Sequence, residues 1–170
     1  MRSIAFLVTG GSGFLGRALI DRLVQMPGCS VIAPLRTPSA TLPVGVRSLR
    51  LGNLDGTNDW KTALTDVDVV VHAAARVHVM NEVALDPLAA FREVNVEATL
   101  NLARQAAVCG VKRFIFISSI KVNGEGTAPG AVYRADDVPG PIDPYGISKY
   151  EAEKRLMVLA ATTGMEVVII

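Results

Sequence analysis

A chain of 170 residues, 50% hydrophobic and 19% charged, is long enough for one domain with a buried core. Its 17 basic and 16 acidic side chains nearly cancel, which argues against binding to nucleic acid or to an anionic membrane. No segment has the length of a signal peptide core or a membrane span, so we expect a cytoplasmic protein. Cys29 and Cys109 lack metal-ligand spacing, and we expect free thiols and no metal site.

Strand-like and helix-like segments alternate along the whole chain. Short continuous apolar runs predict buried strands at residues 4–8, 30–35, 46–51, 67–72, 113–118 and 166–170. Helical periodicity predicts helices at residues 13–25, 60–64, 87–108 and 144–162. Two of these helices begin with Asp-Pro, which supplies an N-cap and a proline at the first helical position. The alternation predicts an α/β fold, a doubly wound parallel sheet of the Rossmann type.

A glycine-rich turn follows the first predicted strand. Residues 9–16 read Thr-Gly-Gly-Ser-Gly-Phe-Leu-Gly and precede a stretch with helical periodicity. Glycines let the backbone approach a pyrophosphate closely, and the N-terminus of the following helix attracts the anion. The residues expected to bind a dinucleotide here are Gly10, Gly11, Ser12, Gly13, Phe14, Leu15 and Gly16. Close packing between a strand and a helix also selects glycines, so this turn alone does not identify the function.

The end of the second predicted strand bears on which dinucleotide is bound. A carboxylate there would bind the adenosine 2′-hydroxyl of NAD, but the sequence has Pro34-Leu35-Arg36. Arg36 can pair with the 2′-phosphate of NADP or stack on adenine. NADP is therefore favoured, and NAD remains the alternative because an arginine stacked on adenine accepts both.

Two further motifs supply candidate catalytic groups. Tyr145 and Lys149, in Tyr-Gly-Ile-Ser-Lys, lie four residues apart and share one helix face. An ammonium near a phenol favours the phenolate, which suits an acid/base near neutral pH. Ser118 and Ser119 end the fifth predicted strand, where open α/β sheets bind ligands. Each motif is weak alone, but their order and spacing together predict a dinucleotide-dependent enzyme.

On these motifs the whole chain resembles the extended short-chain dehydrogenase/reductase superfamily, in particular its nucleotide-sugar epimerase/dehydratase family. Residues 9–16 are similar to the phosphate loop of that family, residues 70–75 (Val-Val-His-Ala-Ala-Ala) to the end of its fourth strand, and residues 145–149 to its catalytic motif. The resemblance implies hydride transfer at a sugar carbon, C4 being the expected one. Tyr145 would be the acid/base, Lys149 would hold the nicotinamide ribose, and Ser119 would hydrogen-bond the reacting oxygen.

The resemblance also implies other contacts and a quaternary structure. The further cofactor-binding residues would be Asn53, Leu54, Ala73, Ala74 and Ala75, beside Tyr145 and Lys149, and the substrate-binding residues would be Arg76, Ser118, Ser119 and Asn123. Asn95, a polar residue in an apolar helical stripe, is expected to bond a neighbouring backbone or to support the active-site helix. His72 is expected to be structural, and His78 to be a solvated loop residue or a substrate contact. A homodimer through a four-helix interface is expected.

Departures from the family pattern narrow the reaction. Ile120-Lys121 stands where dehydrating members carry Asp-Glu, which disfavours a 4,6-dehydratase. Asn123 replaces a tyrosine common in the family and leaves epimerisation and keto-reduction open. The leaning to NADP favours a 4-keto sugar-nucleotide reductase over a 4-epimerase similar to UDP-glucose 4-epimerase. A non-catalytic dinucleotide-binding regulator is a third alternative, which Ser119, Tyr145 and Lys149 together argue against.

The chain stops inside an apolar strand, at residues 166–170. We therefore expect residues 1–170 to be the dinucleotide-binding domain and the N-terminal part of a longer enzyme, with the substrate lobe beyond it.

Overall fold

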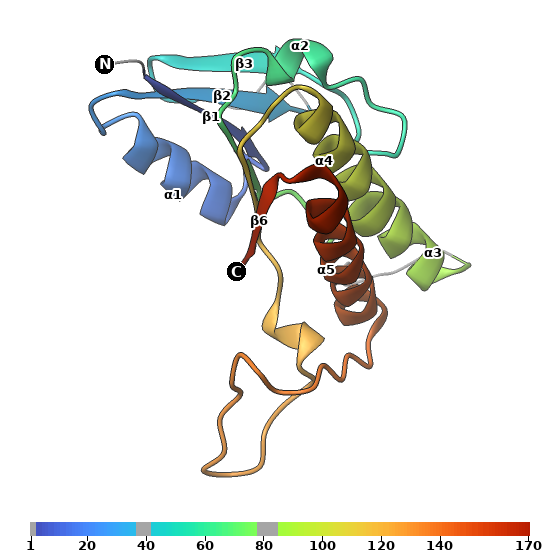
Figure 1. The fold of residues 1–170 in the computed structure, drawn as a ribbon. Coiled ribbons are helices and arrows are strands. Elements are labelled where there is room, and N and C mark those ends of the chain that lie inside the picture. The colour runs from blue at the N-terminus through green and yellow to red at the C-terminus, as the bar shows by residue number, and fades with distance from the viewer. Residues whose placement is uncertain (1–2, 37–41, 78–84) are drawn as a thin grey trace.

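The computed structural model describes residues 3–36, 42–77 and 85–170, and the strands in these ranges form a single sheet (Figure 1). Its six strands are β1 (Ile4–Thr9), β2 (Cys29–Leu35), β3 (Val46–Arg50), β4 (Val69–His72), β5 (Arg113–Phe116) and β6 (Glu166–Ile169). All neighbouring strands are parallel, in the order β3-β2-β1-β4-β5-β6. The order reverses between β1 and β4, where doubly wound sheets bind ligands at the carboxyl ends of their strands. The predicted doubly wound parallel sheet is therefore confirmed.

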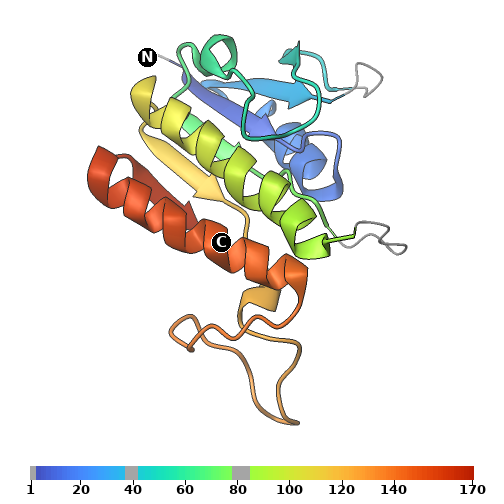
Figure 2. The same cartoon turned by 90° about the vertical axis from the view of Figure 1, so that its right-hand side faces the viewer.

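The helices form a layer on each face of this sheet. The α-helices of the described ranges are α1 (Phe14–Leu23), α2 (Lys61–Leu64), α3 (Pro87–Arg92), α4 (Thr99–Val108) and α5 (Pro144–Thr163). Helix α1 covers one face, while α4 and α5 lie side by side on the other (Figures 1 and 2). Within the same ranges, no helix combines the length and the apolarity that a membrane span requires.

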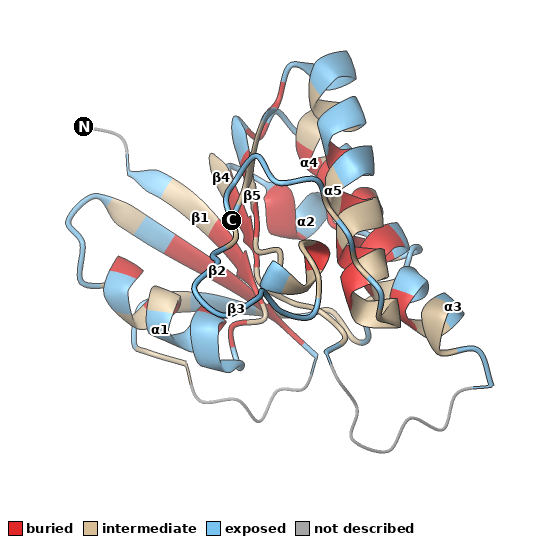
Figure 3. Ribbon diagram, turned by 90° about the horizontal axis from the view of Figure 1, so that it is seen from below, coloured by how far each residue is buried: buried red, intermediate tan, exposed pale blue. Residues whose placement is uncertain are grey.

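The two faces of the sheet bury separate apolar cores (Figure 3). Leu7 and Val70 pack in the core beneath α4 and α5, whereas Val8 and Val71 pack in the core beneath α1. Successive strand residues point to opposite faces, so covering both faces requires apolar residues at consecutive positions. This is why the strands read as continuous apolar runs in the sequence.

The longest predicted helix, at residues 87–108, is interrupted in the structure. A π-helical segment, Glu93–Ala98, separates α3 from α4. Such wider turns are rare in proteins, and those that occur often lie at functional sites. The segment contains Asn95, whose contacts explain the interruption and are described below.

Both Asp-Pro helix starts are confirmed. The Asp86 side chain accepts a hydrogen bond from the Ala89 N–H at 3.0 Å, at the start of α3. The Asp143 side chain accepts one from the Gly146 N–H at 2.5 Å, at the start of α5. The second cap, Asp143, fixes where the candidate catalytic helix begins and lies two residues before Tyr145.

Candidate active site

The glycine turn between β1 and α1 is packed backbone against backbone. Gly10 has a positive φ of 71°, and a Cβ there would lie 2.8 Å from the amide nitrogen of Ala74, just beyond β4. A Cβ on Gly16 would lie 2.2 Å from the Gly10 carbonyl oxygen. These two glycines are therefore required by packing, and the same packing leaves the turn at the strand ends where a ligand would bind.

The start of α1 is open to a ligand. Its N-cap, Gly13, provides no side-chain hydrogen bond, and its first turn contains no acidic residue. Ser12, Gly13 and Phe14 are exposed, Phe14 to 97% of its surface. The positive end of a ten-residue helix thus faces unfilled space beside the sheet reversal. Glycines without room for a Cβ and an open helix N-terminus fit a dinucleotide pyrophosphate.

Helix α5 brings Tyr145 and Lys149 to the end of β5. The Lys149 side chain is 1% exposed, donates a hydrogen bond to the Ile117 carbonyl at 2.6 Å, and places its Nζ 3.8 Å from the centre of the Phe116 ring. Burial lowers the pKa of Lys149 to about 7, and the negative charge of Glu153 opposes this shift. Tyr145 is half-buried, with its ring 6.0 Å from that of Phe91 in an edge-to-face arrangement.

The two strand-end serines have different partners. The Ser119 side chain caps a short 3₁₀ turn, Ile120–Val122, and accepts a hydrogen bond from the Lys121 N–H at 3.3 Å. The Ser118 hydroxyl donates to the carboxylate of Glu153 on α5. Asn123 ends the 3₁₀ turn and is half-buried. Ser119 is thus held by the loop that follows it and Ser118 by α5.

With this geometry established, comparison with known proteins identifies the family. Residues 6–170 match the NAD dependent epimerase/dehydratase family. The chain belongs to that family. It lies within the extended short-chain dehydrogenase/reductase superfamily, as the motifs predicted.

Individual relatives are similar along nearly the whole chain. UDP-glucose 4-epimerase of Vibrio cholerae is 45% identical over 166 residues, which cover 98% of this chain and 50% of that protein. GDP-6-deoxy-D-mannose reductase of Pseudomonas aeruginosa is 32% identical over 163 residues, which cover 95% of this chain and 49% of that protein. UDP-glucuronic acid 4-epimerase from Bacillus cereus, solved with NAD and with UDP-glucuronic acid and NAD, is 26% identical with a TM-score of 0.82, over 98% of this chain and 55% of that one. The chain therefore spans about half the length of these relatives.

Within this candidate site, Asn95 joins the segment after β4 to α5. Its side chain is 1% exposed, and its Oδ1 accepts from the Arg76 N–H at 2.8 Å. Its Nδ2 donates to the Arg76 carbonyl and to the Ser148 hydroxyl, both at 3.0 Å. The Ser148 hydroxyl in turn donates to the Tyr145 carbonyl at 2.7 Å. Both expected roles of Asn95, a backbone contact and support of the active-site helix, are present in the structure.

His72 is buried completely and contacts a threonine at each ring nitrogen. Nδ1 lies 2.7 Å from the Thr9 hydroxyl oxygen, and Nε2 lies 2.9 Å from that of Thr99. Burial, with a contribution from the charge of Lys149, lowers the pKa of His72 to about 3. A neutral imidazole thus links the phosphate loop to α4, in keeping with the structural role expected for it. His78 lies outside the described residues.

The other predicted contacts follow the carboxyl ends of β2, β3 and β4. Ala73, Ala74 and Ala75 are half-buried after β4, and the Arg76 guanidinium carbon lies 5.5 Å from the centre of the Phe91 ring. Arg36, after β2, is exposed. Asn53 is exposed and accepts a hydrogen bond from the Asn58 side chain through its carbonyl, while Leu54 packs against the core.

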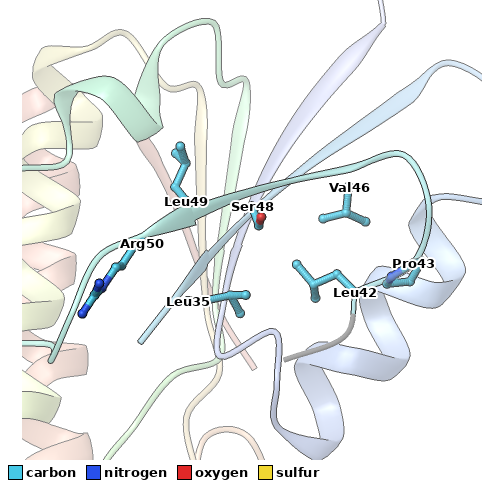
Figure 4. Close-up of a pocket in the computed structure, with 7 residues that line it drawn as sticks. All are labelled: Leu35, Leu42, Pro43, Val46, Ser48, Leu49 and Arg50. Atoms are coloured by element: carbon cyan, nitrogen blue, oxygen red, sulfur yellow. The ribbon is translucent and has the colours of Figure 1, made fainter. Parts of the chain in front are cut away.

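A second arginine at this edge of the sheet, Arg50, was missed by the sequence analysis. Leu35 of β2 pairs with Arg50 of β3, so Arg36 and Arg50 end neighbouring strands, and both are exposed. Only the strand register reveals this pairing, since the two residues are far apart in sequence. Arg50 also lines a cavity of about 370 Å³ at the β2–β3 edge (Figure 4). Its other lining residues include Leu35, Val46 and Leu49, and none of the predicted catalytic residues lines it.

Proposed function

We propose that this chain provides the dinucleotide-binding site and the acid/base residues of a nucleotide-sugar 4-epimerase acting on a UDP-hexose. The observation that carries the proposal is the buried Lys149, fixed at the end of β5 one helical turn from Tyr145 and on the ligand-binding edge of the sheet. The similarity to a UDP-glucose 4-epimerase over nearly the whole chain supports this reaction in preference to the keto-reduction that the sequence favoured.

In the proposed reaction, each residue acts on the sugar oxygen or on the ribose. The dinucleotide, when bound, supplies the hydride acceptor and donor. Tyr145 removes the proton of the C4 hydroxyl and later returns one to the same oxygen. Lys149 binds the nicotinamide ribose and favours the phenolate of Tyr145 by its charge. Ser119 hydrogen-bonds the reacting oxygen, with Arg76, Ser118 and Asn123 proposed along the substrate.

The experiment that tests this function compares two tyrosines on the same helix. Replacing Tyr145 with Phe in the full-length protein should reduce kcat for interconversion of UDP-glucose and its C4 epimer by roughly 10²–10⁴-fold. Dinucleotide affinity should change little, because the phenol is needed for proton transfer and not for binding. Tyr150→Phe, five residues along α5, is the matched control and should keep its activity. A Tyr145→Phe variant with most of its kcat would remove Tyr145 from the mechanism.

A 4-keto sugar-nucleotide reductase using NADP is the second candidate. Two observations favour it: the exposed Arg36 and Arg50 at neighbouring strand ends, and the similarity to GDP-6-deoxy-D-mannose reductase. NAD is the cofactor that accompanies the epimerase proposal, since it is present in the solved Bacillus relative. The simultaneous presence of Ser119, Tyr145 and Lys149 supports either enzyme over a regulator without activity.

Titration with both cofactors separates the two candidates. If a 2′-phosphate is bound at these strand ends, Arg36→Asp should weaken NADP binding far more than NAD binding, because it places a like charge beside the phosphate. Arg47→Asp is the control, since Arg47 is also exposed but pairs with Ile32, four residues before Arg36 and away from the strand ends. Equal losses for both cofactors would assign Arg36 to adenine stacking alone.

The quaternary structure belongs to the same proposal. We infer a homodimer through the outer sides of α4 and α5, which lie together and expose Val108, Met157 and Val158. Exposed apolar residues on adjoining helices are typical of an interaction surface. Sedimentation velocity of the wild-type protein and of Met157→Glu should show a dimer and a monomer, respectively.

A further inference from the structure

Glu153 continues the row of polar residues that Tyr145 and Lys149 begin on α5. The three residues are spaced by four, so they lie one above another on the same helix face. Glu153 is half-buried, and its carboxylate accepts a hydrogen bond from the Ser118 hydroxyl. Ser118 is itself fixed in the sheet, since its N–H donates to the Ile170 carbonyl at 2.6 Å. The carboxylate is therefore held against the end of β5 and is not free to turn into solvent.

Within the part of the chain that the structure describes, Lys149 has few other groups that balance its charge. Its ammonium contacts a backbone carbonyl and the face of an aromatic ring, which offer partial negative charge only. Among the described residues, the titratable groups that act on it are Glu153 from α5 and His72 from β4, whose imidazole is neutral. Tyr145 precedes it by one turn of α5. From β5 it meets Phe116 and Ile117, which do not titrate. Of the described residues, Glu153 thus supplies the carboxylate whose charge acts on this buried cation.

We propose that Glu153 is a positioning residue that, anchored by the Ser118 hydroxyl, keeps the Lys149 side chain in its charged form. The consequence for catalysis rests on the function proposed above, because the charged form is the one that binds the ribose and favours the phenolate of Tyr145. Burial alone drives Lys149 toward the neutral amine, and a carboxylate one turn away opposes this. The pair Ser118 and Glu153 therefore acts on the reaction through Lys149 and need not touch the substrate.

The charge of Lys149 can be measured directly in this chain by NMR titration of lysine labelled at Cε. Lys149→Met assigns its signal among the five lysines. Glu153→Gln should shift the titration midpoint of Lys149 downward by about one pH unit, because the glutamine keeps the acceptor for Ser118 and loses the charge. Ser118→Ala should give a smaller downward shift, since the carboxylate is then free to move away. Glu153→Asp, which restores the charge, should recover part of the shift.

Glu151→Gln is the matched control. Glu151 lies two residues away on the same helix, is also half-buried, and pairs with Arg92 instead of Lys149. It should leave the Lys149 midpoint unchanged. A Lys149 midpoint that is the same in wild type and Glu153→Gln would overturn the proposal, as would an equal shift in the control, which would indicate a general effect of net charge.

Turnover in the full-length protein gives a second, separable readout. Glu153→Gln should shift the pH dependence of kcat in the direction that Lys149 shifts, while Glu151→Gln should not. If no nucleotide sugar is turned over by the wild type, the proposed function fails, yet the titration of Lys149 still tests the role of Glu153. A shifted titration with an unchanged pH profile would instead overturn the link between Glu153 and the reaction.

Discussion

The proposed phosphate-binding end and the proposed catalytic end of the site are built in opposite ways. The loop between β1 and α1 depends on the absence of side chains, because the backbone packs against backbone at Gly10 and Gly16 with no room for a Cβ. The end around Lys149 depends on polar side chains from several elements, such as Asn95 and Glu153, that meet across the sheet edge. A single added methyl group should disrupt the packing of the loop, whereas changes of charge should alter the end around Lys149 gradually.

The largest effect is expected from an added methyl group in the loop. Gly16→Ala would place a Cβ 2.2 Å from the Gly10 carbonyl oxygen and 2.7 Å from its carbon, so α1 would have to move away from β1. The free energy of unfolding should fall by about 3 kcal/mol or more, and dinucleotide binding should be lost. Chemical denaturation and calorimetric titration measure the two changes.

A glycine in open surroundings provides the control. Among the described residues, none apart from the chain neighbours has an atom within 4 Å of the position that a Cβ would take on Gly126, and its φ is outside the left-handed region. Gly126→Ala should change the free energy of unfolding by less than about 0.5 kcal/mol. If the Gly16→Ala and Gly126→Ala variants are equally stable, the loop can accommodate a Cβ, and its close backbone packing is not required for stability.

His72 links the glycine loop to α4, and the pH dependence of stability tests that link. The pKa of His72 is lowered to about 3 in the folded protein, against an ordinary value of 6.5. As the pH falls below about 6.5, the unfolded chain takes up a proton at this histidine and the folded protein does not. The free energy of unfolding should therefore fall, by about 2 kcal/mol between pH 6.5 and pH 5 from this residue alone.

Carboxylates also destabilise proteins in acid, so the contribution of His72 has to be isolated. His72→Gln removes the titrating group and leaves an amide that can bond Thr9 or Thr99. Denaturant unfolding at several pH values should show a lower overall stability for this variant but a shallower slope between pH 6.5 and pH 5. Equal slopes would mean that the folded protein accepts a charged His72, and that the link between the loop and α4 is not a neutral one.

The contrast between the two ends also explains what the sequence could predict. The parallel sheet could be predicted because apolar, strand-like runs alternate with helix-like segments. The glycine loop and the Tyr-Lys pair were recognisable because each motif is continuous in sequence. The contact of Ser118 with Glu153, 35 residues away, and the position of Arg50 beside Arg36 depend on helix rotation and strand register, which no local pattern specifies. The π-helical segment was missed for the same reason, since the bonds of Asn95 to Arg76 and Ser148 accompany a wider turn than local propensity predicts.

The smallest effect is expected at the two helix caps, which look alike in sequence. Asp86 is exposed and accepts one hydrogen bond, from Ala89. Asp143 is half-buried, caps Gly146 and also lies 3.4 Å from the Lys121 ammonium. Burial raises the pKa of Asp143, but the bonds from Gly146 and Lys121 outweigh it and hold the pKa below its usual value. Lys121 thus pairs with the residue that caps the start of α5.

Replacing each cap with alanine should therefore have unequal consequences. Asp86→Ala should lower the free energy of unfolding by about 1 kcal/mol or less, and Asp143→Ala by about 2 kcal/mol. Only Asp143→Ala should also lower kcat in the full-length protein, because Tyr145 follows this cap by two residues and its position depends on where α5 begins. Lys121→Met, which keeps the cap and removes the ion pair, should fall between wild type and Asp143→Ala in stability. Equal losses at the two caps would show that the ion pair adds nothing, and that the start of α5 is held by its N-cap hydrogen bond alone.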